Sequence, residues 1–352
     1  MTPRPSLLDA QAALAELHRI LAQPSPHGRE QHLVQVGAMD GKLRPVVAGE
    51  APERLLVDEL AVTAVVAKLA RLDRAGGVLL HCDNGATHRG RLAVGADGIH
   101  SVVRRQLYPD EGPPRYSGVN MWRGATPWPA FLAGDIMVST GWLTIGKTVV
   151  YPIRRGTPAT GGRPLINWVA ELERPQAVRQ DWTGRGRLSD MMPAFAGLSH
   201  DWLDITGMIE STEEILEYPM VDRDPLERWS FGRVTLLGDA AHPMYPRGSN
   251  GASQAIIDAR CLTGQIKKLG AMPEALVQYE AVRNPATAQV VLTNRTNPPD
   301  SILREVWQRS GDRPFRRIED VISTAELQAI LDRYSKVSGF DRETLRTRPS
   351  FV

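Results

Sequence analysis

The sequence predicts an α/β fold in which one α/β unit is interrupted by a mostly β insert and then resumes, followed by C-terminal helices. Three observations predict it. An apolar strand at Val234–Leu237 ends in Gly238-Asp239, ahead of an apolar-periodic helix that begins near Gly251. A similar strand ends in Gly95–Gly98, and strand-like alternation fills much of the stretch between the two. We therefore expect four segments, over residues 1–112, 113–220, 221–300 and 301–352.

In the first segment, apolar side chains recur at helical spacing in two places and alternate with polar ones elsewhere. Ser6 would cap a helix over residues 7–21, and a second helix over 53–72 would end at Gly76-Gly77. Asp40-Gly41 and Asn84-Gly85 are turn dipeptides typical of β-hairpins. The predicted hairpin strands and the short helix after them cover residues 32–36, 43–47, 78–82, 88–94 and 101–107.

A proline-containing break over residues 109–114 separates this segment from the insert. In the insert, alternating apolar residues predict strands, and after Asp239 the apolar spacing becomes helical. The predicted strands cover residues 120–126, 135–140, 148–153 and 165–172, and the predicted helices cover 251–268, 273–294 and 325–337.

Composition narrows the class of protein. The chain has 42 Lys and Arg against 40 Asp and Glu, so no strongly basic surface predicts nucleic-acid binding. Its two cysteines, Cys82 and Cys261, match neither a metal-ligand spacing nor a disulfide framework. No apolar run is long enough to span a membrane, and the first residues lack the apolar region of a signal peptide. We expect a cytoplasmic globular protein with no metal, membrane or nucleic-acid partner.

The segment Gly238–Asp258 carries the strongest chemical signal. The carboxylate of Asp239 follows a strand, which is where open α/β sheets bind ligands, and it would accept hydrogen bonds from ligand hydroxyls. The helix start after it would add unsatisfied N–H groups and partial positive charge. Gly248 and Gly251 would let the backbone approach a flat ligand closely. The pattern predicts a site for a polyhydroxylated, anionic ligand.

A second turn, Gly95–Arg105, repeats part of this pattern. Asp97 and Gly98 close a strand, Ser101 is placed to cap a helix, and Arg104 adds positive charge one turn into that helix. The arrangement predicts a turn that faces a phosphate. Asp-Gly turns are common, so this turn alone says little about function. It becomes informative because it precedes the Gly238–Asp258 motif and is separated from it by the β insert.

Taken together, the motifs resemble those of the class A FAD-dependent aromatic hydroxylases, which are flavoprotein monooxygenases. VGADGIHSVVR at Val94–Arg104 is similar to the family's Asp-Gly motif, and LLGDAAHPMYPRGSNGASQAI at Leu236–Ile256 is similar to its Gly-Asp motif. MWRG at Met121–Gly124, NWV at Asn167–Val169 and YPMVDRDPLERW at Tyr218–Trp229 extend the likeness, which is strongest toward phenazine-pathway hydroxylases.

The resemblance implies a FAD-binding domain of the glutathione-reductase-like Rossmann type with a β-rich substrate domain inserted into it. NAD(P)H would reduce the FAD, which would then hydroxylate an aromatic or phenazine-like substrate with O2. Asp239 would hold the ribityl chain of FAD. The full set of implied cofactor-binding residues is Asp97, Gly98, Arg104, Gly238, Asp239, Pro246, Gly248, Ser249, Asn250 and Gly251.

Four residues are predicted to line the substrate pocket: Trp122, Trp168, Met244 and Tyr245. The chain has eight Trp against six Phe, and the indole face suits stacking on a flat aromatic ligand, although core packing is an equally good interpretation of these tryptophans. No residue is assigned a catalytic role, because in such enzymes the flavin carries the chemistry. His242 is a conceivable general base, but we expect it to pack and hydrogen-bond structurally.

One element of the family pattern is missing from the sequence, namely the G-x-G-x-x-G turn that holds the ADP half of FAD. Gly28, Gly37, Gly41 and Gly49 do not have its spacing. Losing three charge-assisted hydrogen bonds would remove ~4–9 kcal/mol of binding. We therefore predict an incomplete FAD-binding domain. Three hypotheses stay open: a working hydroxylase, an N-terminally truncated or inactive relative that cannot hold FAD alone, and a non-catalytic scaffold. Oligomeric state and the choice of NADH or NADPH are also open.

Overall fold

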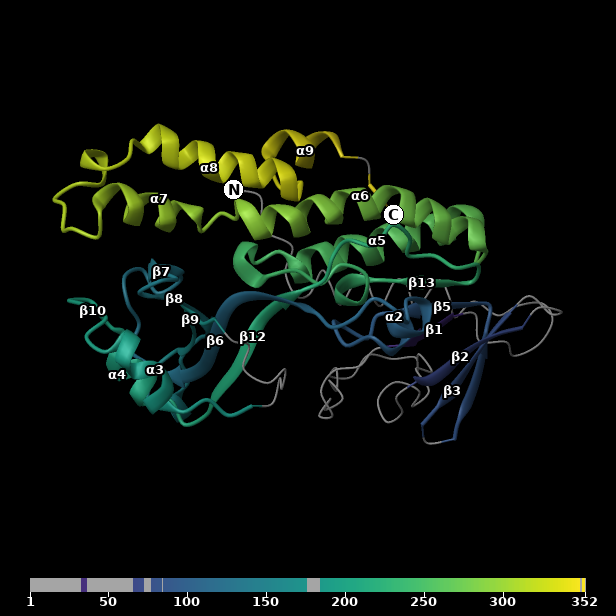
Figure 1. Cartoon of the computed structure of the whole chain (residues 1–352), viewed down its shortest axis with the longest axis horizontal. Helices are drawn as coiled ribbons and strands as arrows, with labels where there is room; N and C mark the ends of the chain where they lie inside the picture. The colour runs from purple at the N-terminus through teal and green to yellow at the C-terminus, as the bar shows by residue number, and fades with distance from the viewer. Residues whose placement is uncertain are drawn as a thin grey trace. The chain divides into compact units, whose positions relative to one another are not determined.

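The computed structural model describes residues 33–36, 66–72, 77–83, 85–175, 184–348 and 350–351. It divides into two compact units, each assembled from separate stretches of chain (Figure 1). Unit 1 takes its described residues from Met1–Arg115, Asp222–Pro298 and Asp332–Val352. Unit 2 takes them from Tyr116–Val221 and Pro299–Leu331. The predicted segment over residues 301–352 is thus shared between the two units.

Unit 1 contains a parallel sheet of three strands in the order β1-β5-β13, with β1 at Leu33–Val36, β5 at Leu92–Gly95 and β13 at Val234–Leu236. Ala93 of the central strand lies opposite Val34 on one side and Val234 on the other. Because the strands run parallel, their carboxyl ends meet at one edge of the sheet. Both sequence motifs follow strands of this sheet and therefore begin at that edge.

A second sheet of unit 1 is antiparallel and contains β2 (Val66–Leu72), β3 (Gly77–Cys82) and β4 (Thr87–Gly90). The predicted helix over 53–72 is wrong over residues 66–72. This stretch is rich in good helix formers, but there it pairs with β3, whose edge would otherwise be open. The predicted strand over 88–94 also divides, because β4 ends at Gly90 and the next residues join the parallel sheet as β5.

The predicted strands over residues 32–36 and 78–82 form as β1 and β3, but other N-terminal predictions cannot be compared with the structure. The predicted helix over residues 7–21, the predicted strand over 43–47 and residues 53–65 of the second predicted helix lie outside the described residues. The later predictions can be compared, and they agree in type with the observed elements. The predicted strands of the insert and the helices after Asp239 all form, with ends that shift by a few residues.

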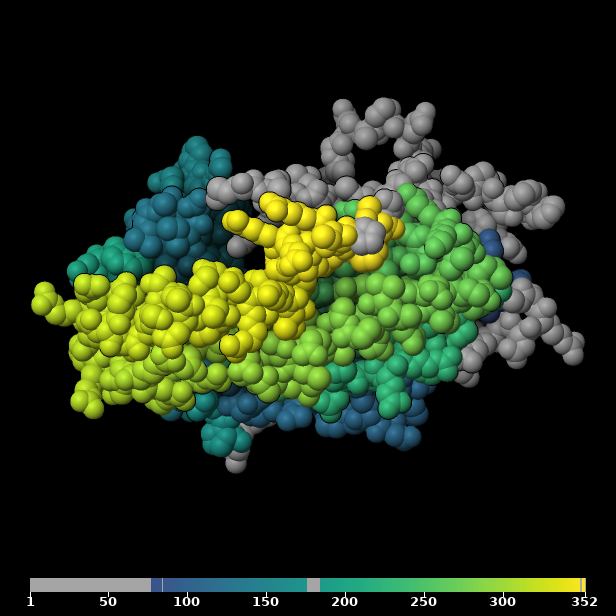
Figure 2. Space-filling view, turned by 90° about the horizontal axis from the view of Figure 1, so that it is seen from above, coloured from purple at the N-terminus to yellow at the C-terminus, as the bar shows by residue number. Residues whose placement is uncertain are grey.

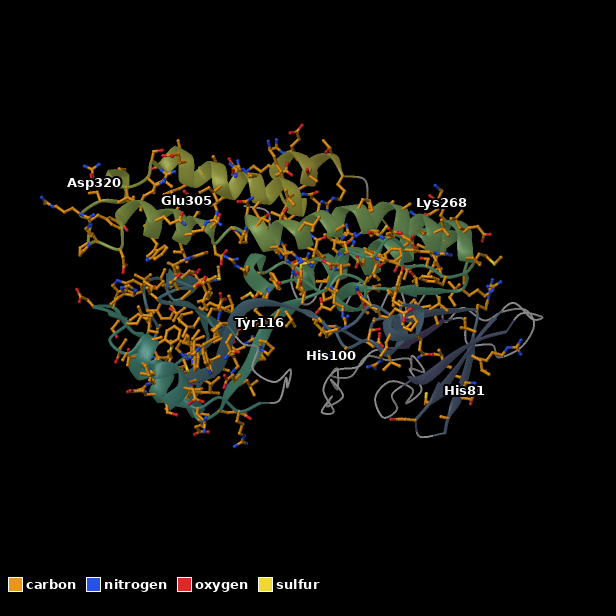
Figure 3. All side chains as sticks on the ribbon, viewed as in Figure 1. His81, His100, Tyr116, Lys268, Glu305 and Asp320 are labelled. Atoms are coloured by element: carbon orange, nitrogen blue, oxygen red, sulfur yellow. The ribbon has the colours of Figure 1, made fainter. Side chains whose placement is uncertain are left out.

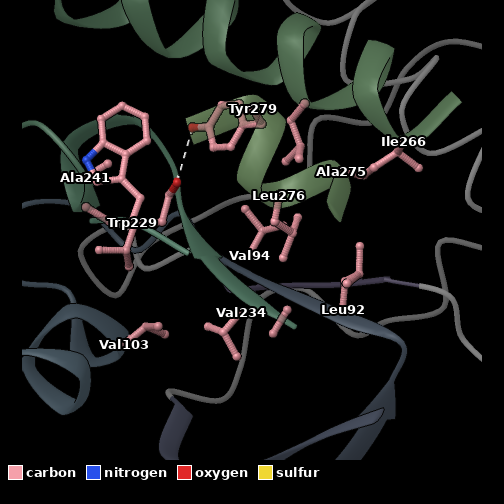
Figure 4. Packing of buried hydrophobic residues seen from close by; sticks show 14 of the residues in the cluster. Leu92, Val94, Val103, Trp229, Val234, Ala241, Ile266, Ala275, Leu276 and Tyr279 are labelled. Atoms are coloured by element: carbon pink, nitrogen blue, oxygen red, sulfur yellow. Dashed lines mark hydrogen bonds between the residues drawn. The ribbon is translucent and has the colours of Figure 1, made fainter. Parts of the chain in front are cut away.

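Helices α5 (Gly251–Leu269) and α6 (Pro273–Thr296) pack against the parallel sheet of unit 1 and bury its main core. Figure 4 shows Val94 and Val234 from the strands in one cluster with Ile266 and Leu276 from the helices. The unit also contains α2 (Val102–Leu107), the end of α8 (Thr324–Ser338) and α9 (Arg342–Thr347). Among the described residues, none of the helices is long and apolar enough to cross a membrane.

Unit 2 is built on a five-stranded sheet with the order β12-β6-β9-β8-β7. Its apolar face packs against α3 and α4 around Trp122 and Trp168. The opposite face, called the polar face below, carries Arg123, Asn167 and Glu171. The strands of the sheet are β6 (Arg115–Pro127), β7 (Val138–Trp142), β8 (Gly146–Arg154), β9 (Leu165–Glu173) and β12 (Ile215–Asp222), and the remaining elements are α3 (Leu188–Phe195), the hairpin β10 (Ser199–His200) with β11 (Leu203–Asp204), and α4 (Ile205–Glu210).

A buried lysine attaches the C-terminal part of unit 2 to its sheet. The Lys147 side chain is 2% exposed, and its Nζ donates to Glu171 Oε2 at 2.8 Å and to Asp300 Oδ2 at 2.7 Å. Asp300 immediately precedes α7 (Ser301–Ser310), which packs against β7. Two carboxylates around one ammonium leave no uncompensated positive charge in the interior. α7, which carries the labelled Glu305 in Figure 3, is therefore fixed to the sheet through its N-cap residue.

Close packing under the unit 2 sheet gives a direct stability prediction at Gly124. A Cβ on this residue would lie 2.6 Å from Thr212 Cγ2 and 2.7 Å from Trp168 Cζ2. We expect Gly124→Ala to destabilise the protein by about 1–3 kcal/mol, because an overpacked core must shift. Urea unfolding followed by tryptophan fluorescence measures the change. The control is Ala125→Val at the next, exposed position, which should change stability by about 0.5 kcal/mol or less.

Candidate functional site

The Gly-Asp motif forms a sharp turn at the carboxyl end of β13. Gly238 has φ 61°, a conformation that favours glycine, and the 3₁₀ turn Gly238–Ala240 follows. Asp239 in this turn stays accessible to solvent. A Cβ on Gly251 would lie 3.7 Å from Asp239 Oδ1 and 4.0 Å from Met244 Cγ. The turn therefore brings Asp239, Met244 and the first residue of α5 together.

The first residues of α5 lie beside Asp239 and leave backbone N–H groups without partners inside the helix. Asn250 is the N-cap and makes no side-chain cap hydrogen bond, and the N–H of Gln254 donates to its carbonyl at 2.9 Å. The N–H groups of residues 251–253 precede this bond and point out of the helix. Desolvation by the surrounding protein raises the pKa of Asp239, while nearby His242 partly opposes that rise. One carboxylate acceptor and a helix start that favours negative charge suit a ligand with hydroxyls and an electron-accepting ring.

Hydrogen bonds between polar side chains stabilise the loop between Asp239 and α5. The 3₁₀ turn Pro246–Gly248 leads into Ser249, which has φ 51°. Tyr334 of α8 accepts a hydrogen bond from Asn250 Nδ2 at 3.1 Å and donates to Asn294 Oδ1 at 2.6 Å. The sequence alone does not identify Tyr334 and Asn294 as residues of the site. Both lie far from the loop along the chain, and no sequence pattern indicates that they contact it.

A buried ionic network lies beneath the turn. Asp258 is fully buried; its Oδ2 is 2.5 Å from His242 Nε2 and accepts from the Gly238 N–H at 3.1 Å. Its Oδ1 accepts from Arg283 Nε at 2.7 Å, and Arg283 also donates to Gln254 Oε1 at 2.6 Å. The structural role predicted for His242 agrees with this geometry. Sequence reasoning missed Asp258 and Arg283, although an aspartate on the apolar face of a predicted helix is a usable signal.

The Asp-Gly motif proves to be closely tied to its own helix. Asp97 is 3% exposed; its Oδ2 accepts the N–H groups of Val102 and Val103 at 2.7 and 3.2 Å, and its Oδ1 accepts from the Ser101 hydroxyl at 2.5 Å. Ser101 is the N-cap of α2, as predicted, and its Oγ accepts from the Arg104 N–H at 2.8 Å, so Asp97 and Ser101 together satisfy the first N–H groups of the helix. Gly98 has φ 74°, which lets the chain turn into that helix. A contact of these two residues with a pyrophosphate stays a prediction.

Arg104 has a different task from the phosphate contact predicted for it. It is 1% exposed and donates from all three guanidinium nitrogens. Its acceptors are the Ala240 and Ala241 carbonyls at 3.0 and 2.8 Å, the Asp224 carbonyl at 3.3 Å and the Glu111 carboxylate. The five N–H groups of an arginine are thereby used within the protein. Arg104 fixes the Gly-Asp turn to α2, and no donor is left for a phosphate.

The four predicted substrate residues lie in two different environments. Trp122 and Trp168 are 1% and 0% exposed in the core of unit 2, and Trp168 Nε1 donates to Thr212 Oγ1 at 2.9 Å. These positions favour core packing, and a substrate contact stays a prediction. In unit 1, half-buried Met244 lies beside Gly251, and Tyr245 precedes the 3₁₀ turn. Burial, with the carboxylate of Asp222 nearby, raises the pKa of Tyr245 to about 12.

The polar face of the unit 2 sheet holds a donor cluster that sequence reasoning missed. Arg123 on β6 is exposed, and its Nε donates to Asn167 Oδ1 on β9 at 2.8 Å. Asn167 is 2% exposed, and its Nδ2 has no hydrogen-bond partner among the described residues. Burial raises the pKa of Tyr218 on β12, whose hydroxyl interacts with Arg123. Alternation within MWRG and NWV places Arg123 and Asn167 opposite the buried tryptophans, which could have indicated this face.

Residues 42–294 match the FAD binding domain family. The chain therefore belongs to this family of FAD-binding proteins. Among its relatives is the phenazine 1,6-dicarboxylic acid hydroxylase PhzS of Lysobacter antibioticus, 41% identical over 69% of this chain and 58% of its own length. The 6-hydroxynicotinate 3-monooxygenase of Bordetella bronchiseptica is 31% identical over 70% of this chain and 61% of its own length. The chain thus spans about three fifths of these relatives.

Solved structures support the same assignment. The HpxO protein of Klebsiella pneumoniae, solved with FAD and uric acid, is 25% identical, with a TM-score of 0.57 over 76% of this chain and 66% of that one. A salicylate hydroxylase in complex with substrate is 24% identical, with a TM-score of 0.60 over 97% of this chain and 90% of that one. The second likeness concerns the fold, and it covers both units.

Proposed function

We propose that this chain is an FAD-dependent monooxygenase that hydroxylates an aromatic small molecule with NAD(P)H and O2. The observation that carries the proposal is the position of Asp239, accessible at the carboxyl end of β13 and within van der Waals reach of the open start of α5. A Cβ on Gly251 would fill the space next to that carboxylate. A flat ligand edged by hydroxyls suits this space.

The residues present suit one half of FAD. The Asp239 carboxylate would accept hydrogen bonds from the ribityl hydroxyls, and the N–H groups at the start of α5 would face the edge of the flavin ring. Residues Pro246–Gly251 would line that edge. When bound, the flavin takes a hydride from NAD(P)H and activates O2, chemistry that no protein side chain supplies. The residues that would hold the ADP half stay unassigned.

The polar face of unit 2 supports a substrate that carries a carboxylate. The Arg123 guanidinium is exposed, and because Asn167 Oδ1 holds its Nε at 2.8 Å, the side chain offers its terminal N–H donors as a pair. Such a pair matches the two oxygens of a carboxylate. The relatives named phenazine 1,6-dicarboxylic acid hydroxylase and 6-hydroxynicotinate 3-monooxygenase have acidic substrates in their names, which agrees with this interpretation.

Replacing Arg123 with methionine is expected to weaken binding of an aromatic acid about 10- to 100-fold, the effect of losing ~1.5–3 kcal/mol from charge-assisted hydrogen bonds. Salicylate is a suitable probe, with salicylamide as the uncharged comparison, and dissociation constants come from fluorescence quenching. Arg154→Met, at another exposed arginine of the same sheet, is the control. Equal losses for the acid and the amide would contradict a carboxylate contact.

The decisive test of the proposed function begins with the visible absorbance of the purified protein before and after FAD is added. We expect flavin bands that persist through gel filtration. NADH and NADPH oxidation is then followed with and without 6-hydroxynicotinate, salicylate and a phenazine carboxylate, and we expect faster oxidation and a hydroxylated product with one of them. A protein that stays colourless in excess FAD contradicts the proposal and favours an inactive relative.

A further inference from the structure

Helix α8 makes a contact with the Pro246–Gly251 loop that the family match does not include, because α8 follows the matched residues 42–294. Tyr334, on its last turns, is 6% exposed. A Cβ on Gly248 would lie 1.6 Å from the Tyr334 hydroxyl and 2.5 Å from Cζ of its ring. The phenol therefore lies directly against the backbone of the loop at Gly248, where only a glycine leaves room for it.

The hydroxyl of Tyr334 also joins a directed chain of hydrogen bonds. Asn250 Nδ2 donates to it at 3.1 Å, and it donates to Asn294 Oδ1 at 2.6 Å. Asn294 is fully buried, and its Nδ2 donates to the Tyr245 carbonyl at 3.0 Å. Tyr334 and Asn294 thus connect residues on both sides of the 3₁₀ turn, at Tyr245 and at Asn250. Hydrogen bonds therefore fix the loop at both ends, at Tyr245 and Asn250, and the Tyr334 ring packs against its middle at Gly248.

A second contact fixes α8 to the same end of α5. Gln254 Nε2 donates to the Ser338 carbonyl at 3.0 Å, one helical turn beyond Tyr334. Figure 2 shows the last residues of the chain, in yellow, at the surface beside the green residues of unit 1, and Phe351 packs against the same core. The contact through Tyr334 therefore belongs to the end of α8, which packs within unit 1.

We propose that Tyr334 is a positioning residue for the cofactor loop, acting together with Asn294. It holds Tyr245–Gly251 in the one shape in which Asp239, Gly251 and the open start of α5 face the same ligand. Ser249 has φ 51°, a conformation that an unsupported serine rarely keeps. The side chain of Tyr334 need not touch the cofactor. This inference rests on the proposed function only for the identity of the ligand as FAD.

The test is Tyr334→Phe, which keeps the ring and removes the hydroxyl. We expect amide hydrogen exchange within Tyr245–Gly251 of the FAD-free protein to become faster. We also expect the Kd for FAD, measured by quenching of FAD fluorescence, to rise about five- to tenfold, the effect of losing one or two modest hydrogen bonds. Asn294→Ser removes both contacts of that amide and should produce the same pair of changes.

The control is Tyr108→Phe, because Tyr108 also donates from its hydroxyl to a backbone carbonyl in unit 1, that of Arg228 at 2.6 Å. It should leave loop exchange and FAD affinity unchanged. Unchanged loop exchange in Tyr334→Phe, or equal effects in Tyr108→Phe, overturns the proposal. If the wild-type protein binds no FAD, the exchange measurement still decides whether Tyr334 holds the loop, and only the proposed function falls.

Discussion

Replacing Asp239 with alanine is expected to weaken FAD binding about 10- to 100-fold, since a carboxylate that accepts hydroxyl hydrogen bonds contributes ~1.5–3 kcal/mol. Its carboxylate is the accessible acceptor beside the start of α5. Titration of the protein with FAD, followed by fluorescence quenching, measures the change. Asp110→Asn, at an exposed aspartate of the same unit, is the control and should bind as the wild type does.

Asp239→Asn separates ligand binding from stability. Desolvation raises the pKa of Asp239 in the folded state, so ionisation of this carboxyl opposes folding. The stabilising protonated form is present below the unfolded pKa and is lost as the pH rises through the folded pKa. At neutral pH the uncharged Asp239→Asn variant should therefore be at least as stable as the wild type without FAD, and yet bind FAD more weakly. A variant that loses stability and affinity together would indicate a structural role for Asp239 instead.

Replacing Asp258 with asparagine is expected to destabilise the protein by about 3–5 kcal/mol, the usual effect of breaking a buried ion pair from one side. Arg283, 5% exposed, would lose its charged partner at 2.7 Å, and His242 would lose its acceptor. Urea unfolding at pH 7 measures the change. Glu319→Gln, which breaks the exposed pair with Arg317, is the control and should leave stability nearly unchanged.

The pH dependence of this effect has a definite sign. Burial alone would raise the pKa of Asp258, but His242 and Arg283 outweigh it and hold that pKa below the usual value of 3.8. Its contribution to stability is therefore complete above the unfolded pKa and is lost as the pH falls through the folded pKa. The stability difference between wild type and Asp258→Asn should be constant near neutral pH and shrink in strong acid. A difference that grows on acidification would contradict the assigned ion pair.

The part of the site that lies on consecutive residues could be predicted from the sequence. The strand, the Gly238-Asp239 turn and the helix after it are local features, because glycine conformation, strand ending and helix start are each determined within a few residues. The insert was also predictable, since its strands alternate clearly over most of their length. The helical pattern over residues 66–72 was misleading because pairing with β3 outweighs a weak local preference.

The supporting contacts could not be predicted in the same way. Tyr334 meets Gly248 only after α8 packs against the loop, and Arg283 meets Asp258 only after α6 packs against α5. Helical spacing predicts the helix over residues 325–337, but it does not indicate which of its residues meets the loop. For Arg104, the sequence predicted a ligand contact where the fold supplies protein contacts. A positive charge near a turn favoured binding of a phosphate, but in the structure this guanidinium donates to the Ala240 and Ala241 carbonyls.

The parallel sheet of unit 1 has a consequence for how the chain folds during synthesis. Its central strand β5 ends at Gly95, but its neighbour β13 begins only at Val234, after the whole first stretch of unit 2. The antiparallel strands β6, β8 and β9 pair over much shorter distances. Contacts between residues that are close in sequence form fastest. We therefore expect the inserted sheet to fold on the ribosome before β13 has been synthesised and can pair with β5. The Asp239 turn would then be among the last parts to form, since it closes the long interval around an already folded insert.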